Sequence, residues 1–446
     1  MTRVLIAGSG GREFELGRSF LESDLAPEVH YAYANGAMQH PYLDALSHDI
    51  SNTPEAFAHL AYELEVDLAV VSSERQLERD FIGALAKEGI TAFGPDATSA
   101  KHETSKAYGA DFCERHKIAK PKHWVVEDID SAIDAISGRD PESYVIKADG
   151  LADGKGVILP KTEEEARKEL HKLMVDGAYA GGGLERVVIQ ERFHGPEVSM
   201  FIVMDGNGGY SVLPFVQDHK RIGEDDKGLN TGGMGAYLPI DELLSDRQRQ
   251  KLMGIADQIV KGMQTDGTGY AGVLYTGIML AEELDGDPAV FEFNARWGDP
   301  ETQVQMLVLS AGGIDVLQMH LAAARGELTL PRDMTRSSCA AITVALARAG
   351  YPVGVAPESQ RIYGLDRVPA DVLLQFAGVT IDGLDLRASG GRVAYVTALA
   401  ETLEEAAAKA YGAVGRGGVH FDGMQYRRDI GHLLRPNWRS TVRVGR

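Results

Sequence analysis

The chain opens with a short apolar strand, a glycine-rich turn and a helix. The strand is expected over Val4–Ala7 and the helix from about Phe14 to Leu21, with the turn Gly8–Glu13 between them. This order is typical of a doubly wound α/β unit, in which helices cover both faces of a parallel sheet. Further strands of this unit are expected at Val29–Ala34, Asp67–Val71 and Thr91–Phe93.

The glycine turn predicts a binding site for an anionic group. Glycines let backbone N–H groups approach a phosphate, and the N-terminus of the following helix favours negative charge. The turn is not a complete dinucleotide fingerprint, because Glu13 replaces the last glycine and the next strand ends near Asn35 without an acidic ribose ligand. We therefore expect a phosphate-bearing substrate here, with a purely structural turn as the alternative. The residues concerned are Gly8, Ser9, Gly10, Gly11, Arg12 and Glu13.

Length and charge exclude several classes of protein. A chain of 446 residues is too long for one hydrophobic core, so several domains are expected. A formal net charge of −20 argues against sequence-independent nucleic-acid binding. Cys113 and Cys339 form no disulfide or metal pattern. No apolar run is long enough to span a membrane, and the N-terminus does not resemble a signal peptide, so we expect a cytoplasmic protein.

The stretch Phe291–Gln303 combines a metal-binding pattern with an anion-binding side chain. It begins as a strand, so Glu292 and Asn294 share one face. Their carboxylate and amide oxygens are ligands that suit Mg²⁺. Arg296 continues this face with a guanidinium that fits a carboxylate or a phosphate. The pattern indicates ATP chemistry on an acidic substrate, and the alternative is a half-buried strand with a solvated polar face.

A second pattern predicts a lid over a nucleotide. The strand Tyr144–Lys147 ends in a lysine, and the glycine-rich hairpin Asp149–Gly156 that follows carries Lys155. Backbone N–H donors and ammonium groups on such a hairpin suit a triphosphate. It is not a P-loop, because no Ser or Thr follows Lys155 and a strand comes next. Lys106, at the start of an earlier helix, could also reach a phosphate, with an ordinary solvated lysine as the alternative. The alternative is a plain glycine hairpin.

The remaining segments complete the expected order of elements. The polar run Gln217–Arg221 lies at a strand end, where its side chains suit a functional site better than a hydrophobic core. Thr231–Tyr237 is expected to be a flexible glycine loop. Other expectations are strands at Glu197–Met204 and Ser211–Val216, a helix at Asp241–Gln264, a hairpin of Val273–Ala281 with Ala289–Phe293, helices at Thr302–Leu309 and Ile314–Arg325, strands at Cys339–Leu346, Asp371–Phe376 and Arg392–Ala398, and a helix at Thr402–Val414.

Taken together, the motifs resemble the phosphoribosylamine–glycine ligase (glycinamide ribonucleotide synthetase) family. The resemblance spans nearly the whole chain and rests on Lys106 and the runs 146–157, 217–221, 230–237 and 292–303. It implies an ATP-grasp fold of mixed α/β and α+β class. The implied regions are a doubly wound N-terminal domain (1–97), an ATP-grasp domain (98–332) with a nucleotide lid (about 121–190), and a mixed C-terminal domain (333–446).

The resemblance also implies a reaction. ATP would phosphorylate the carboxylate of glycine, and the amine of 5-phosphoribosylamine would attack the acyl phosphate. The products would be glycinamide ribonucleotide, ADP and phosphate, in de novo purine biosynthesis. The implied cofactors are ATP with Mg²⁺ or Mn²⁺. The expected partners are these small substrates only, without nucleic acid or membrane, and the expected state is a monomer or a homodimer.

Individual roles follow from the matching positions. The implied catalytic residues are Arg296, Lys147, Asp218 and Lys220. ATP would be bound by Lys106, Lys147, Gly154, Lys155, Gly156, Glu191, Phe193 and Glu197. The other substrates would be bound by the Gly8–Glu13 turn and by Glu74, Asp218, Lys220, Arg296, Asp299, Pro300 and Glu301. The metal would be bound by Glu292 and Asn294.

Three positions depart from the family pattern, all in the substrate-side regions. Phe14 stands where the family has His, Ser72-Ser73 where it has Gly-Pro, and Phe376 where it has His. Replacing His by Phe removes hydrogen-bonding capacity and adds apolar surface. The departures are either neutral divergence or signs of a different amine or amino acid. A related ATP-grasp ligase with another substrate and a non-catalytic nucleotide-binding protein are therefore the alternatives.

Overall fold

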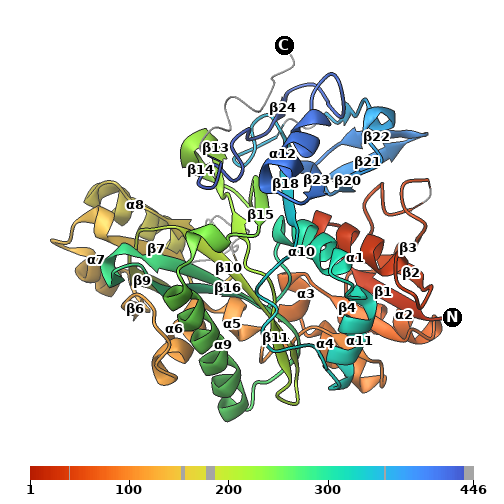
Figure 1. Ribbon diagram of the computed structural model, residues 1–446. Helices are drawn as coiled ribbons and strands as arrows, with labels where there is room; N and C mark the ends of the chain where they lie inside the picture. The colour runs from red at the N-terminus through yellow and green to blue at the C-terminus, as the bar shows by residue number, and fades with distance from the viewer. Residues whose placement is uncertain (40, 152–155, 177–185, 356–357, 436–446) are drawn as a thin grey trace.

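The computed structural model describes residues 1–39, 41–151, 156–176, 186–355 and 358–435 (Figure 1). The N-terminal region lies on one side of the molecule and a lid region on the other, with a central sheet between them and the C-terminal region above. The predicted mixed α/β and α+β class is confirmed. Four residues of the predicted lid tip, 152–155, lie outside the described residues, and they include the predicted site residues Gly154 and Lys155.

The N-terminal region is a parallel sheet in the order β3-β2-β1-β4-β5. Its strands are β1 (Arg3–Ala7), β2 (Glu28–Ala32), β3 (Leu46–His48), β4 (Leu68–Val71) and β5 (Ala92–Phe93), and its helices are α1 (Gly11–Leu21), α2 (Pro54–Glu63), α3 (Glu74–Glu78) and α4 (Phe81–Lys87). The strand order reverses at β1, which places the glycine turn at the edge where such sheets bind ligands. The doubly wound prediction is confirmed, although β3, α2, α3 and α4 were not predicted.

The lid region is a separate antiparallel sheet in the order β6-β9-β7-β8. Its strands are β6 (His123–Val126), β7 (Tyr144–Ala148), β8 (Val157–Ile158) and β9 (Val187–Glu191), and the helices of this part of the chain are α5 (Lys101–Thr104), α6 (Lys106–Arg115), α7 (Ile129–Ile136) and α8 (Glu163–Met174). Lys147 pairs with Val157, which confirms the hairpin on both sides of its tip. Helices α7 and α8 cover the sheet and give it a core of its own.

The central sheet is antiparallel, in the order β11-β10-β16-β17. Its elements are β10 (Glu197–Asp205), β11 (Tyr210–Val212), β16 (Ala271–Ala281) and β17 (Asp287–Asn294), with helices α9 (Asp246–Asp266), α10 (Glu301–Ala311) and α11 (Val316–Arg325). The predicted hairpin is confirmed. The helix predicted from Asp241 begins later, because Ser245 caps it and exchanges hydrogen bonds with Gln248.

The C-terminal sheet runs β12-β15-β18-β23-β20, with β24 beside β18. The elements of this region are β12 (Gln217–Asp218), β13 (Arg221–Gly223), β14 (Lys227–Asn230), β15 (Gly235–Leu238), β18 (Ala340–Arg348), β19 (Gln360–Arg361), β20 (Val372–Phe376), β21 (Val379–Asp382), β22 (Asp385–Ala388), β23 (Arg392–Ala400), α12 (Leu403–Gly412) and β24 (Met424–Gln425). The prediction of a flexible loop at Thr231–Tyr237 is wrong at its C-terminal end, because that end forms the buried strand β15. Strand β18, distant in sequence, supplies the partner that the local pattern did not reveal.

Among the described residues, no single helix is long and apolar enough to cross a membrane. The pair α10 and α11 passes the same length and composition test only jointly, and the two helices are bent by 102° relative to each other.

Candidate active site

Strand β17 carries the two predicted metal ligands. Its register with β16 shifts beside Gly277, which leaves Phe291 as an extra residue next to Glu292. Such a bulge re-aims the side chains of the strand. Phe293 is buried in the core. Because side chains alternate along a strand, Glu292 and Asn294 on either side of Phe293 face away from that core.

Glu292 lies in a strongly cationic environment. The Lys220 ammonium is 3.1 Å from Glu292 Oε1 and 3.0 Å from Glu197 Oε2. Burial alone would raise the pKa of Glu292, but Lys220, Lys106 and Lys147 together lower it to about 2. Lys220 pairs with both carboxylates, and Lys106 and Lys147 add positive charge around Glu292. This excess of positive charge favours a polyanion such as a triphosphate.

A pocket opens beside these charges. Val188, Val290 and Phe291 supply apolar surface, while Lys106 and Lys147 supply positive charge. An apolar surface suits the base of a nucleotide, and the ammonium groups beside it suit the phosphates. The Lys147 ammonium donates to the carbonyl oxygen of Phe291 at 2.8 Å, and burial lowers the pKa of Lys147 to about 8.

The base of the predicted lid is fixed to the helix that carries Lys106. Asp149 Oδ1 accepts hydrogen bonds from the Ser105 hydroxyl at 2.9 Å and from the Ala107 N–H at 3.1 Å. A carboxylate at a helix N-terminus is stabilised by the helix dipole. At the other side of the hairpin, the carbonyl oxygen of Gly156 accepts from the N–H of Ala148 at 2.8 Å. The hairpin therefore begins and ends at fixed points.

The structure does not bring every predicted nucleotide-binding side chain to this pocket. Glu191 and Phe193 are not among the residues that line it, and Glu191 lies 3.8 Å from the exposed Lys122. The neighbouring Gln190 lines the pocket instead. Sequence reasoning also missed the pocket residues His102, Cys113 and Lys120, which carry no recognisable motif.

Arg296 is part of a chain of alternating charges. Its guanidinium lies 3.0 Å from Glu103 and 3.4 Å from Glu74, and Glu74 is also 4.0 Å from Arg12. Burial would raise the pKa of Glu74, but Arg296 and Arg12 lower it to about 2. Arg296 also donates to Asn294 Oδ1 at 3.3 Å. Two carboxylates therefore already balance Arg296, which weakens its attraction for a substrate carboxylate. Glu103 was not predicted.

Glu13 folds back over the glycine turn. Its carboxylate accepts from the Gly10 N–H at 2.9 Å, from Arg12 Nε at 2.7 Å and from the Ser72 hydroxyl at 2.7 Å. The turn was predicted to hold the phosphate of a substrate. In the structure one of its N–H donors is already occupied by the carboxylate of the protein itself, so a phosphate here depends on the remaining donors of the turn.

A third group of predicted residues surrounds Asp218. Burial and the neighbouring Glu301 raise the pKa of Asp218 well above its usual value. A glycine is needed opposite it: Gly233 has φ +110°, and a Cβ there would lie 2.7 Å from Asp218 Oδ1 and 2.3 Å from a ring carbon of Pro300. The loop thus packs directly against Asp218 and Pro300.

Arg392 holds this loop in place from the C-terminal sheet. It donates to the carbonyl oxygens of Gly232 at 2.6 Å and Asp299 at 2.8 Å, and lies 3.4 Å from the Asp299 carboxylate. Sequence reasoning missed Arg392, which stands at the start of an apolar strand far along the chain. An arginine directly after two glycines, Gly390 and Gly391, was the only available signal.

A lysine-bearing hairpin on one sheet faces a carboxylate-bearing strand on another across a pocket. This arrangement defines the ATP-grasp class of ATP-dependent ligases. The fold agrees with this class. The biotin carboxylase domain of Hydrogenobacter thermophilus 2-oxoglutarate carboxylase, solved with MgADP, superposes with a TM-score of 0.73 at 17% identity, over 95% of this chain and 91% of that one.

Closer relatives define the family. Models of the phosphoribosylglycinamide synthetase N domain, ATP-grasp (A) domain and C domain match residues 2–103, 104–302 and 341–433. A phosphoribosylamine–glycine ligase of Escherichia coli O157:H7 is 36% identical over 446 residues, covering 99% of both chains. The crystal structure of the Thermotoga maritima ligase has a TM-score of 0.81 at 34% identity, over 96% of this chain and 100% of that one. The chain belongs to the phosphoribosylglycinamide synthetase family, and it is an ATP-dependent ligase.

Proposed function

We propose that the protein joins glycine to 5-phosphoribosylamine with consumption of ATP, through a glycyl phosphate, and releases glycinamide ribonucleotide, ADP and phosphate. The observation that carries this proposal is the cluster of Lys106, Lys147 and Lys220 around Glu292, beside a pocket lined by apolar and cationic side chains. The family relationship supports the choice of glycine and 5-phosphoribosylamine. We also place the reaction in the cytoplasm, as expected from the sequence.

The residues on β17 fit a divalent metal ion. Glu292 is ionised, and the amide oxygen of Asn294 accepts one long hydrogen bond, from Arg296 at 3.3 Å. Hard oxygen donors of this kind suit Mg²⁺ or Mn²⁺. Such an ion, when bound, offsets the charge that develops on the transferring phosphate. Lys220, which pairs with Glu197 and Glu292, would add positive charge for the phosphates.

The protein itself contributes charge and exclusion of water. Lys106 and Lys147 hold phosphate oxygens, and the family pattern assigns Gly154, Lys155 and Gly156 to the same nucleotide. Water must be kept out, because a free acyl phosphate hydrolyses. Asp218 accepts the proton that the amine loses on attack. Its buried Oδ1 has no hydrogen-bond partner among the described residues, and burial raises its pKa.

The departures from the family pattern favour these substrates over different ones. Phe14 and Phe376 pack edge to face, with ring centroids 5.7 Å apart and planes at 81°, and both are buried. Ser72 directs its hydroxyl to Glu13. These side chains contact one another or other residues of the protein, so they offer little surface that a different substrate could contact. Two histidine positions that have both become phenylalanine, and that pack against each other, are expected of neutral divergence.

A direct assay tests the proposal. Purified protein is mixed with ATP, Mg²⁺, glycine and freshly generated 5-phosphoribosylamine, and ADP, phosphate and the amide are measured. Equal amounts of all three products are expected. Rapid ADP release with other amines but none with this pair would identify a ligase with another substrate. Tight ATP binding without any ADP release would identify a non-catalytic nucleotide-binding protein.

A further inference from the structure

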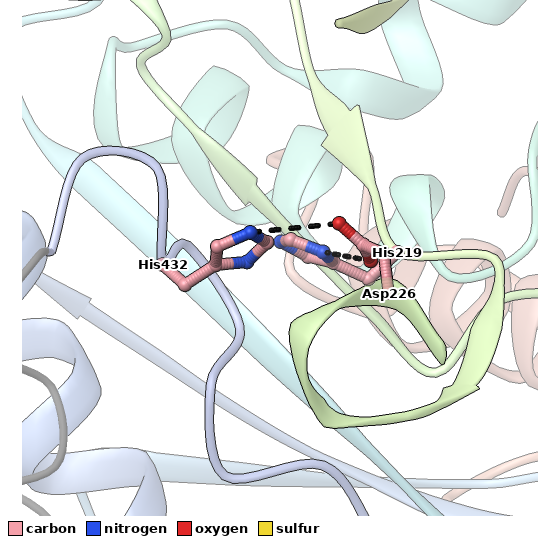
Figure 2. Close-up of side chains that lie close together, drawn as sticks. All are labelled: His219, Asp226 and His432. Atoms are coloured by element: carbon pink, nitrogen blue, oxygen red, sulfur yellow. Dashed lines mark hydrogen bonds and ion pairs between the residues drawn. The ribbon is translucent and has the colours of Figure 1, made fainter. Parts of the chain in front are cut away.

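A cluster of potential metal ligands lies behind the active site. His219, Asp226 and His432 come from the strand end at β12, the β13–β14 hairpin and the C-terminal segment (Figure 2). Their ligand atoms lie within 4.8 Å of one another. Two imidazoles and a carboxylate at this spacing are a familiar metal-binding set. Whether they bind metal depends on which nitrogen atoms carry hydrogen.

The hydrogen bonds of His219 fix its protonation. The N–H of Gly431 donates to Nε2 at 2.9 Å, so Nε2 holds a lone pair. An imidazole with a lone pair on one nitrogen is neutral and carries its single N–H on the other, and burial lowers the pKa of His219 in the same sense. That hydrogen is therefore on Nδ1, which lies 3.4 Å from Asp226 Oδ1. A metal on Nδ1 would move the hydrogen to Nε2, directly against the Gly431 N–H.

Asp226 is also occupied by the protein. Arg427, which is fully buried, donates to Asp226 Oδ1 at 2.6 Å and pairs with Asp429 at 2.7 Å. His432 Nε2 lies 3.5 Å from the other Asp226 oxygen. The guanidinium thus supplies the positive charge that a metal ion would bring. The cluster is a hydrogen-bonded anchor rather than a metal site.

This anchor acts on the strand that carries two predicted catalytic residues. The backbone ladder continues past β12, because the His219 N–H donates to Gly235 O at 2.9 Å and the Met234 N–H to His219 O at 2.8 Å. Side chains alternate in such a strand, so Asp218 and Lys220 face opposite to His219. Lys220 accordingly reaches Glu292 and Glu197, while His219 reaches the C-terminal segment.

We propose that His219 is a positioning residue, whose Nδ1–H form couples the C-terminal segment 427–431 to the placement of Asp218 and Lys220. This inference rests on the proposed function of those two residues. The same segment supports the neighbouring strand as well, since Ile430 packs closely on Gly235. The C-terminal segment is thereby part of the active-site architecture, although it does not reach the pocket.

Two substitutions separate the two hydrogen bonds of His219. The amide oxygen of His219→Gln can take the place of Nε2 and still accept from Gly431, whereas the amide N–H of His219→Asn can take the place of Nδ1 and donate only to Asp226. Because a displacement near 1 Å can reduce turnover about 100-fold, we expect His219→Asn to lower amide formation by about that factor. His219→Gln is expected to keep more activity than His219→Asn.

The matched control is His432→Gln, which alters the same cluster but not the site strand. Its partly exposed contact with Asp226 is worth little, so we expect activity within about twofold of the unsubstituted protein. The discriminating measurement is the ratio of amide formed to ADP released. It should fall well below that of the unsubstituted protein in His219→Asn, because uncaptured glycyl phosphate hydrolyses. A purely structural role would lower both products together.

Nitrogen NMR of ring-labelled histidine provides a test that is independent of activity. We expect His219 to show a protonated Nδ1 and an unprotonated Nε2. The opposite form, or greater activity in His219→Asn than in His219→Gln, would overturn the inference. So would stoichiometric Zn²⁺ or Mn²⁺ binding to the nucleotide-free protein that His432→Gln abolishes. Failure of the proposed function is distinguishable from these outcomes, because the unsubstituted protein would then make no amide.

Discussion

At the scale of single residues, the central feature is a carboxylate that keeps its charge although it is partly buried. Lys220, Lys106 and Lys147 hold the pKa of Glu292 near 2 despite the cost of burial. Lys220 pairs with Glu292 and Glu197, whereas Lys106 and Lys147 donate to backbone carbonyl oxygens. A bound polyphosphate completes the balance, and this explains why charged groups gather at a site that packing alone would fill with apolar side chains.

Glu292→Gln should abolish most turnover while the fold persists. The substitution keeps the shape of the side chain but removes the charge that binds the metal and pairs with Lys220. We expect amide formation to fall by at least about 100-fold, as when a group that stabilises the transition state is lost. The control is Glu283→Gln at the other end of the same hairpin, where an exposed pair with His194 should change activity by no more than about twofold. Undiminished turnover in Glu292→Gln would refute its role.

His320 makes the protein sensitive to acid. Its Nδ1 donates to Val316 O at 2.7 Å and its Nε2 accepts from the Trp297 N–H at 3.1 Å, so both nitrogens suit only the neutral ring. Burial lowers the pKa of His320 to about 4. In the unfolded chain the pKa of this histidine is near 6.5, so between pH 4 and 6.5 the unfolded state binds more protons than the folded state. The contribution of His320 to stability is therefore complete above about pH 6.5 and declines as the pH falls towards 4.

Urea unfolding at pH 7.5 and pH 5 measures this effect. We expect His320 to account for a loss of about 2 kcal/mol in unfolding free energy between the two conditions. His320→Gln should show a smaller loss than the unsubstituted protein. His59→Gln, which changes an exposed histidine, should show the same loss as the unsubstituted protein. Equal pH dependence in all three proteins would contradict the assignment.

At the scale of elements, helix α1 and strand β20 meet through two of the departures from the family pattern. Phe14 and Phe376 lie edge to face, and Tyr42 contacts the same Phe376 ring with centroids 6.1 Å apart. Aromatic pairs in this arrangement contribute beyond the apolar area that they bury. The two phenylalanines are therefore expected to depend on each other, and to leave substrate choice unaffected.

A double-mutant cycle with Phe14→His and Phe376→His tests this dependence. Each single change should destabilise the protein by about 1–3 kcal/mol, because it buries a polar ring in an apolar contact. The double change should cost less than the sum, by about 0.5–1.5 kcal/mol. Additive losses would show that the rings are independent. A change of preferred amine in either single variant would show that the departures alter the substrate.

Elements with strong local signals could be predicted from the sequence, and contacts between distant elements could not. The apolar runs of β16 and β17 and the cap of α12 at Thr402 are local signals, and all three elements were predicted. Strand β15 depends on pairing with β18, and the Arg392 contacts depend on β23 approaching a loop far earlier in the chain. The metal ligands were proposed from strand alternation, whereas Glu103 and Gln190 became candidates only when the fold was known.

At the scale of the whole molecule, the N-terminal and C-terminal regions are fastened together, whereas the lid sheet has its own core. Gln375 on β20 donates to Glu15 on α1 at 3.1 Å and accepts from Thr397 on β23 at 2.8 Å. A buried network of this kind is costly to break. We therefore expect the lid sheet to move as a unit during catalysis while the other two regions stay joined.

Hydrogen exchange can locate this movement. Binding of a non-hydrolysable ATP analogue should slow exchange in β7, β8 and β9, because the lid closes on the pocket, and should leave β20 and β23 nearly unchanged. A comparison with ADP, which lacks the terminal phosphate, shows whether that phosphate is needed. Equal slowing in β20 and β7 would contradict the division into a moving lid and a fixed frame.

Transfer of oxygen-18 from glycine to phosphate tests the central claim most directly. If ATP phosphorylates the glycine carboxylate and the amine then displaces that phosphate, one carboxylate oxygen must leave with the phosphate. Glycine labelled at both carboxylate oxygens is incubated with ATP, 5-phosphoribosylamine and the protein, and the released phosphate is analysed by mass spectrometry. We predict one labelled oxygen in each phosphate formed. Unlabelled phosphate, released together with the amide, would contradict the account.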